Sequence, residues 1–213
     1  MTAVAPHPDE AALQRVLDAM APRGIRLGCR LIRDGDEAAL LPDETRSIPS
    51  RHSERLRASG AARLAARRLL REAGLGDRAV PRGASGEPIW PEGWTGSLAH
   101  DEAMALAALG RIDAVRSLGV DVEPCAPLPE ELLALVVGSQ DRLPSPAGPE
   151  GARLVFSAKE AVYKAVFPLD RRILDYEDIA VDLVAGMART RTGHAVRLVT
   201  CAAPRIVTLA IYL

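Results

Sequence analysis

Lysine is nearly absent from this 213-residue chain. Only two of its 27 basic side chains are lysines, Lys159 and Lys164, and all the others are arginines. An ammonium group is a compact point charge that sits well against a phosphate oxygen, whereas a guanidinium is a planar fork. Both lysines fall within residues 156–165, and we therefore expect the chain to be organised around that stretch.

Cysteine is also scarce. The three cysteines lie far apart and form no C-x-x-C pair, which argues against a disulfide framework and a thiolate metal site and indicates a reducing compartment. The N-terminal residues include Asp9 and Glu10 and lack the apolar segment of a signal peptide, and no apolar run approaches the length of a membrane span. We expect a soluble, cytoplasmic protein.

The net charge is also small, and aromatic residues are few. The formal net charge is −1, so no global field draws the chain onto nucleic acid or an anionic membrane. Aromatic residues make up 3% of the chain, which predicts an aliphatic core. With 48% hydrophobic residues, the chain is long enough to bury a full core as one large domain or two small ones.

Arginine is concentrated in residues 46–71, where Glu54 is the only acid. The alanines and leucines in the second half of this segment predict a helix with a basic face. Such a face suits a phosphate-bearing or acidic partner, although ordinary solvation is the alternative for any one arginine. Nucleic acid is disfavoured, because no aromatic side chains are interleaved for base stacking. The eight arginines are Arg46, Arg51, Arg55, Arg57, Arg63, Arg67, Arg68 and Arg71.

The remaining patterns predict a mixed α and β chain. We expect helices over 9–20 and 155–167, and strands over 27–32, 101–109, 117–123, 178–184, 195–200 and 206–211. The strand over 101–109 is expected against the helical propensity of its alanines, for a reason given below. Turn residues predict loops over 34–49 and 81–96, a mobile connection over 138–151 and a turn near 191–193.

The predicted strand 117–123 places two acids on one face. Asp121 and Glu123 are two residues apart, so their side chains lie about 7 Å apart on the same side of the strand. One oxygen from each could reach a shared Mg²⁺ at about 2.0–2.1 Å. Gly119, two residues earlier, hints at a close approach of another backbone. The alternative is an ordinary polar face.

The predicted helix 155–167 adds a third acid. Glu160 and Lys164 are four residues apart and share one face, whereas Lys159 points about 100° away from Glu160. We expect Pro168 to end this helix. The alternative is that Ser157 and Glu160 form a capping box, and that Glu160 and Lys164 are a surface pair.

Three motifs occur in order: GSLAH at 96–100, GVDVE at 119–123 and FSAKEAVYKA at 156–165. In this order and spacing they resemble the 4′-phosphopantetheinyl transferases, specifically the Sfp-type, enterobactin-synthase-component-like branch. The resemblance covers about residues 47–213. It implies an α+β fold of two similar α/β subdomains related by a pseudo-twofold axis, each with a small antiparallel sheet and a long helix. We place the boundary between 1–115 and 116–213, and in this fold the run 102–109 is a strand.

The resemblance also implies a reaction. The phosphopantetheine arm of coenzyme A, bound between the subdomains, would be transferred to a serine of an apo carrier protein of fatty acid, polyketide or non-ribosomal peptide synthesis, with release of 3′,5′-ADP. The cofactor would be Mg²⁺, with Mn²⁺ as the alternative ion, and the branch implies a monomer. By resemblance, the three residues that match the metal ligands are Asp121, Glu123 and Glu160.

The other site residues follow in the same way. Lys164 matches the lysine at the pyrophosphate, and His100 matches a histidine near the 3′-phosphate. Arg82 stands at the nucleotide end, and Arg51 lies in the segment that contributes to the 3′-phosphate and adenine pocket. We expect Lys159 to contact the phosphate or the carrier protein.

The chain departs from the family pattern at two places. Ala99 replaces a hydroxyl residue before the histidine, and Ser59-Gly60 replaces a pair that usually supplies a phosphate cation. Arg57 or Arg63 could compensate for that missing cation.

The residues support phosphoryl transfer independently, because that reaction needs charge neutralisation and positioning more than covalent help. Glu160 is our candidate general base, directly or through a water, and Lys164 would neutralise the pyrophosphate. Two other interpretations are open: another Mg²⁺-dependent phosphotransferase or phosphohydrolase, and a non-catalytic arginine-rich binding module.

Overall fold

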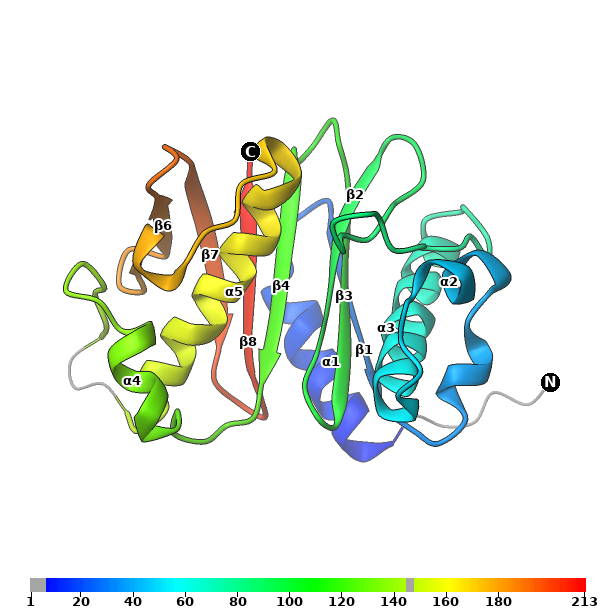
Figure 1. Cartoon of the computed structure of the whole chain (residues 1–213), viewed down its shortest axis with the longest axis horizontal. Coiled ribbons are helices and arrows are strands. Elements are labelled where there is room, and N and C mark those ends of the chain that lie inside the picture. Colours follow the sequence, from blue (N-terminus) through cyan, green and yellow to red (C-terminus); the bar gives the residue numbers. More distant parts are fainter. Residues whose placement is uncertain (1–6, 145–147) are drawn as a thin grey trace.

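Two antiparallel sheets lie side by side, and one long helix covers each of them (Figure 1). The computed structural model describes residues 7–144 and 148–213. The expected α+β arrangement, with a small antiparallel sheet and a long helix in each half of the chain, is confirmed. In the described ranges no helix is both long enough and apolar enough to cross a membrane.

The first sheet has the strand order β1-β3-β2, with both pairs antiparallel. Its strands are β1 (Ile25–Leu31), β2 (Trp94–His100) and β3 (Met104–Arg111). The predicted strand in the alanine-rich run is confirmed as β3, whose residues up to Gly110 are buried. Helix α3 (Ser53–Glu72) packs on β3 and β1, and small alanine side chains let the helix and the strand approach. Tertiary packing therefore outweighs the helical propensity of alanine.

The second sheet has the order β4-β8-β7-β6-β5, and all of its pairs are antiparallel. Helix α5 (Gly151–Asp170) lies across it and packs mainly on β4 and β8 (Figure 1). Four of its strands were predicted from the sequence, whereas β6 was missed. The strands are β4 (Ser117–Glu123), β5 (Ile179–Asp182), β6 (Met187–Thr190), β7 (Ala195–Cys201) and β8 (Ile206–Tyr212).

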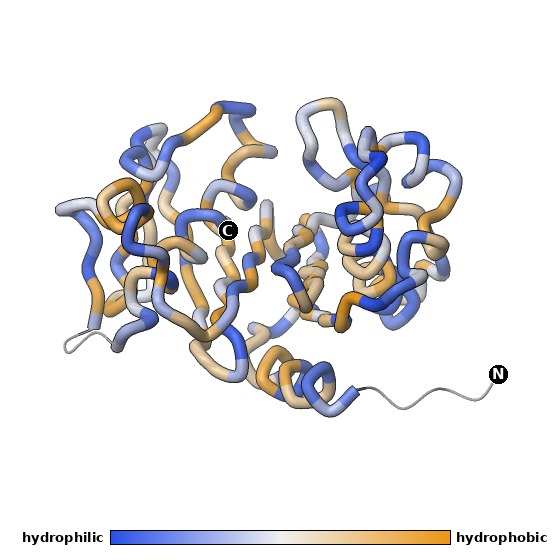
Figure 2. Tube along the Cα trace, turned by 60° about the horizontal axis from the view of Figure 1, so that its bottom comes forward, coloured by the Kyte–Doolittle hydropathy of each residue, from blue (hydrophilic) through white to orange (hydrophobic). Residues whose placement is uncertain are grey.

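The two sheets share a hydrophobic core. Helix α1 (Pro8–Met20) packs against β1 and also touches β7, and its Leu13 and Leu17 are fully buried. They join residues of β1, β3, β4 and β8 in one cluster. In Figure 2, α1 lies at the bottom and shows hydrophobic positions among hydrophilic ones. The predicted helix over 9–20 is thereby confirmed, and it seals the core beneath both sheets.

Gly119 sets the spacing between β4 and α5. A Cβ atom at this position would lie 1.8 Å from the carbonyl oxygen of Ala161, which is far inside van der Waals contact. The close backbone approach suggested by this glycine is therefore present, and its neighbour is the helix that carries Glu160 and Lys164. The strand bearing Asp121 and that helix consequently lie in direct contact.

Several local predictions were wrong. Helix α5 does not end before Pro168 but continues to Asp170, with the proline inside its last turn. The capping box, given above only as the alternative, is not formed either, because the helix begins six residues before Ser157 and the Ser157 hydroxyl donates to Thr208. The expected loop 34–49 contains the 3-10 helix η1 (Asp36–Ala39) and helix α2 (Pro42–Ser47).

The expected mobile connection over 138–151 is only partly tested, since 145–147 fall outside the described residues. Its first part is anchored to β5: Asp141 accepts a hydrogen bond from the Val181 amide at 2.8 Å, and the backbone of Arg142 forms an isolated parallel β-bridge with that of Asp182. Helix α4 (Glu130–Val136), which precedes it, was not predicted.

Candidate active site

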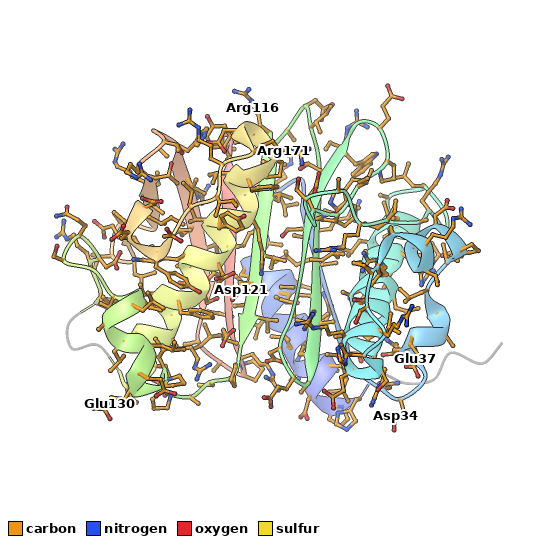
Figure 3. All side chains as sticks on the ribbon, viewed as in Figure 1. Asp34, Glu37, Arg116, Asp121, Glu130 and Arg171 are labelled. Carbon is orange, nitrogen blue, oxygen red and sulfur yellow. The ribbon has the colours of Figure 1, made fainter. Side chains whose placement is uncertain are left out.

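Asp121 lies where β4 meets α5, in the middle of the molecule (Figure 3). Its Oδ1 accepts a hydrogen bond of 2.7 Å from Lys164 Nζ, which also donates to the carbonyl oxygen of Val120 at 3.2 Å. The other oxygen, Oδ2, is buried and has no hydrogen-bond partner among the described residues. A buried carboxylate oxygen without a partner is costly unless a ligand supplies one. One oxygen of Asp121 is therefore held and the other is available.

The charges around Asp121 act on one another. Burial raises the pKa of Asp121, the adjacent Lys164 ammonium lowers it, and the charge of Glu160 raises it. Glu160 is therefore close enough to Asp121 to repel it. The alternative interpretation, a surface pair between Glu160 and Lys164, is not supported, because the lysine is bonded to Asp121 on the strand instead.

Glu123 lies on the same strand, two residues beyond Asp121. Its Oε2 accepts from Arg153 Nη1 at 2.6 Å, and Arg153 also donates to the carbonyl oxygens of Ala126 and Pro127. Burial raises the pKa of Glu123, Arg153 lowers it, and the charge of Asp121 raises it. Arg153 therefore fixes Glu123 and the turn that follows β4.

Glu160 is held by a residue that the sequence analysis missed. The hydroxyl of Tyr176, in the 3-10 helix η2 (Tyr176–Asp178), donates to Glu160 Oε1 at 2.8 Å. Burial raises the pKa of Tyr176, and the neighbouring Glu160 raises it further, so the phenol stays protonated and remains a donor. Tyr176 is sixteen residues from Glu160, and no local spacing in the sequence links them.

The three acids do not form a ready metal cluster. Within 7–144 and 148–213, no three or more His, Cys, Asp or Glu side chains are arranged to hold a metal ion. Each acid has one oxygen bonded to a protein donor: Lys164 for Asp121, Arg153 for Glu123 and Tyr176 for Glu160. The orphaned Oδ2 of Asp121 is the feature that fits a cation.

Lys159 does not point into this site. Its ammonium is buried, lies 2.7 Å from Asp141 Oδ2 and donates to the Tyr176 carbonyl oxygen at 2.9 Å. The side chains of Lys159 and Asp141 are only 2% and 1% exposed. The expected contact of Lys159 with coenzyme A or a carrier protein therefore has no support in this structure, because both partners of the ammonium are internal.

A cleft of about 470 Å³ lies next to β2 and α3 and contains four basic side chains: Arg55, Arg63, Arg82 and His100. His100 is at the end of β2, and desolvation by the surrounding protein lowers the pKa of its imidazole, although the residue itself is exposed at the surface. The charges of Lys164 and Asp121 also reach it. Strand β2, which ends at His100, packs against β4, which carries Asp121.

The structure separates the candidate arginines. Arg63 lines the cleft, donates through Nε to the Val80 carbonyl oxygen at 2.9 Å, and has its pKa lowered by burial. Arg57 instead pairs with Asp34 at 2.5 Å, outside the cleft, and Arg51 does not line it either. Of the two compensating arginines considered, the structure places Arg63 in the cleft.

Arg55 was not among the predicted site residues, although it lines the cleft. The signal was present, since positions 55, 59 and 63 follow one another at intervals of four residues and share a helix face. The Ser59-Gly60 departure also has a structural reason. A Cβ atom at Gly60 would lie 2.0 Å from the carbonyl oxygen of Asp36, so η1 packs directly on this turn of α3.

The expected exposed basic face of residues 46–71 is wrong in part. Arg63 and Arg67 are buried, and Arg67 forms an ion pair with the fully buried Glu44. Four others form ion pairs on the surface or near it: Arg46, Arg57, Arg68 and Arg71. Most of this arginine charge is therefore neutralised by partners within the chain.

Two family models match the chain, one in each half. Residues 36–110 match the 4′-phosphopantetheinyl transferase N-terminal domain, and residues 117–203 match the 4′-phosphopantetheinyl transferase superfamily. The two ranges contain all four basic residues of the cleft and all three acids.

Several individual proteins that this chain resembles are also 4′-phosphopantetheinyl transferases. The chain is 39% identical to the 4′-phosphopantetheinyl transferase PptT of Mycobacterium tuberculosis over 146 residues, which are 65% of this chain and 63% of that protein. It is 35% identical to Svp of Streptomyces mobaraensis, with 74% and 68% covered, and 33% identical to Npt of Nocardia iowensis, with 84% and 82% covered. Thus the alignment spans slightly less than two thirds of PptT but most of Npt. With the fold and the site described above, these matches show that the chain belongs to the Sfp-type family of 4′-phosphopantetheinyl transferases.

Proposed function

We propose that the chain transfers the 4′-phosphopantetheine arm of coenzyme A to a serine hydroxyl of an apo carrier protein. The observation that carries this proposal is a juxtaposition of two sets of charges. Strand β2, which ends at His100 beside the cleft arginines Arg55, Arg63 and Arg82, packs against β4, which carries Asp121 bonded to Lys164. Coenzyme A carries a 3′-phosphate and a pyrophosphate, and cations in a cleft are the groups that bind them.

In the proposed reaction the serine Oγ attacks the β-phosphorus of the pyrophosphate. The new Oγ–P bond forms as the bond between this phosphorus and the bridging oxygen breaks, and 3′,5′-ADP leaves with that oxygen. The serine proton goes to Glu160, directly or through a water. Tyr176 keeps the Glu160 carboxylate in place through its hydrogen bond of 2.8 Å. Lys164 lies beside Asp121 and supplies positive charge for the pyrophosphate.

Mg²⁺, or Mn²⁺ in its place, is part of the proposal. Asp121, Glu123 and Glu160 would hold it, and the unpartnered Oδ2 of Asp121 is the support from this structure. When bound, the ion would neutralise charge on the pyrophosphate. We further propose a cytoplasmic monomer that acts on neither nucleic acid nor membrane, with its two subdomains divided at residues 115 and 116.

One incubation tests the activity. The chain is mixed with coenzyme A, Mg²⁺ and an apo carrier protein, and the carrier is weighed by mass spectrometry. A gain of one phosphopantetheine arm is the expected result. Loss of coenzyme A without a change in the carrier would instead indicate a hydrolase, and neither change would indicate a binding module. A panel of fatty acid, polyketide and non-ribosomal peptide carriers then identifies the carrier class.

A further inference from the structure

Glu44 is fully buried, although it is a charged residue of the short helix α2. Its carboxylate accepts two hydrogen bonds from Arg67 Nη1, at 2.9 and 2.7 Å, and the Arg67 side chain is 5% exposed. It also accepts from the backbone amides of Leu41 at 2.8 Å and Val80 at 2.9 Å. A buried ion pair is weak evidence for stability, because desolvation offsets its attraction. The position of its other partners suggests a different role.

Those partners lead to the cleft along two routes. The amide of Val80 is bonded to Glu44 and its carbonyl oxygen to Arg63, so this peptide is held between the ion pair and a cleft arginine. The second route passes through Ser47, whose hydroxyl donates to the Glu44 carbonyl oxygen and accepts from the Arg82 amide, both at 2.9 Å. Residues 48–50, which follow α2, also line the cleft.

We propose that Glu44 and Arg67 are positioning residues, which hold Arg63 and Arg82 in the geometry that binds the nucleotide of coenzyme A. This inference rests on the proposed function. Neither residue lines the cleft, so each acts through α2 and through the segment from Val80 to Arg82. Loss of the ion pair would release both walls of the cleft together, while Asp121, Glu160 and Lys164 on the other sheet would stay in place.

The experiment is calorimetric titration of the full chain with 3′,5′-ADP, the proposed nucleotide product. Glu44→Gln keeps the shape of the side chain but removes its charge, and Ser47→Ala removes the hydroxyl that links the Glu44 carbonyl oxygen to the Arg82 amide while it leaves the ion pair intact. The expected result is a rise in Kd of about 10-fold for Glu44→Gln and about 3-fold for Ser47→Ala, as loss of one or two hydrogen bonds implies. With coenzyme A as substrate, KM rises with kcat nearly unchanged.

A matched control separates positioning from stability. Leu17→Ala leaves a cavity at a fully buried position on α1, in a core cluster that contains no residue of the cleft. It should lower the melting temperature without changing α2. Unchanged binding in Leu17→Ala supports the proposal. If Leu17→Ala weakens binding as much as Glu44→Gln, or if Glu44→Gln and Ser47→Ala both bind as tightly as the wild type, the inference is overturned while the proposed function stands.

Two further results are also decisive. If Glu44→Gln does not fold, Ser47→Ala alone decides, because its side chain makes no buried ion pair. If the wild-type chain binds neither 3′,5′-ADP nor coenzyme A, both the inference and the proposed function are overturned.

Discussion

The hydroxyl of Tyr176 donates a hydrogen bond of 2.8 Å to Oε1 of Glu160 and thereby joins η2 to the middle of α5. The carbonyl oxygen of the same tyrosine accepts from Lys159 at 2.9 Å. Tyr176 is thus held at both ends, and its position fixes the carboxylate that we propose as general base.

Replacement of Tyr176 by phenylalanine tests this relationship. A hydrogen bond to a charged group contributes about 1.5–3 kcal/mol, so Tyr176→Phe is expected to lower kcat by about 10-fold or more. The KM for coenzyme A should change little, because the cleft arginines are untouched. Steady-state kinetics of carrier modification provide the measurement.

The matched control for this variant is Tyr212→Phe. The ring of Tyr212 packs edge-on against His194, which is bonded to Asp170 at the C-terminal end of α5 and not to Glu160, so loss of the Tyr212 hydroxyl should leave kcat unchanged. Equal rates in Tyr176→Phe and the wild type would show that Glu160 does not depend on this bond.

Gly119→Ala is expected to destabilise the protein. The added methyl group would lie 1.8 Å from the Ala161 carbonyl oxygen, and neither backbone can move without disturbing β4 or α5. Overpacking of this kind costs about 1–3 kcal/mol, and the displaced helix would also carry Glu160 and Lys164 away from Asp121. The free energy of unfolding measured in urea and the rate of carrier modification should therefore both fall.

A second glycine provides the control for that change. At Gly138 the nearest atom to an added Cβ lies 3.7 Å away, which is ordinary contact. Gly138→Ala should be nearly neutral. A Gly119→Ala protein as stable and active as Gly138→Ala would mean that β4 and α5 do not require this close approach.

Lys159→Met is expected to affect stability but not coenzyme A binding. The change leaves Asp141 without its buried cation, and an uncompensated buried charge costs about 3–5 kcal/mol. Adding Asp141→Asn removes that charge, so the double variant should recover part of the loss in a double-mutant cycle. Weaker binding of coenzyme A by a Lys159→Met protein of unchanged stability would restore the ligand role expected from the sequence.

The sequence predicted most elements that have a regular hydrophobic pattern. The alternation in residues 117–123 predicted β4, and the arrangement of motifs correctly outweighed alanine propensity for β3. The motifs also named the acids and lysine that the structure brings together, Asp121, Glu160 and Lys164. Local pattern and motif order are properties of short segments, which explains why they could be read from the chain.

The relationships that the sequence could not supply link distant segments. Exposed and buried arginines look alike in residues 46–71, and Arg67 is buried where Glu44 and the Ala39 carbonyl oxygen accept its hydrogen bonds. Lys159 resembles a ligand-binding residue by its place beside Glu160, yet its ammonium forms a buried ion pair with Asp141. In both cases the partner that decides the role lies far away in the sequence. For example, Glu44 lies 23 residues from Arg67.

Arg55 and Arg57 form a natural pair for testing the cleft. Arg55 lines the cleft, whereas Arg57, on the opposite side of α3, pairs with Asp34 outside the cleft. Arg55→Ala should raise the KM for coenzyme A by about 10-fold with little change in kcat, because a charge-assisted hydrogen bond is lost from binding. Arg57→Ala should leave both constants near the wild-type values. The opposite pattern would assign the phosphate contact to Arg57.

Cys29 predicts how stability depends on pH. This thiol is 1% exposed, and burial raises its pKa from 9.0 to about 12. Below pH 9 the thiol is protonated in both the folded and the unfolded chain, so it has no effect there. Above pH 9 only the unfolded chain releases the proton, and the free energy of unfolding falls as the pH rises towards 12, by up to about 1.4 kcal/mol for each unit of pH.

Urea unfolding at pH 8 and pH 10.5 measures this effect as a difference between variants. Cys29→Ala removes the titrating group, so its loss of stability between the two pH values should be smaller than that of the wild type by about 2 kcal/mol. Other groups titrate equally in both proteins and cancel in the comparison. Cys125→Ser, at an exposed cysteine, should retain the wild-type slope. An identical slope in Cys29→Ala and the wild type would show that the Cys29 thiol ionises as readily in the folded chain as in the unfolded one, and that the core around α1 and β1 admits water.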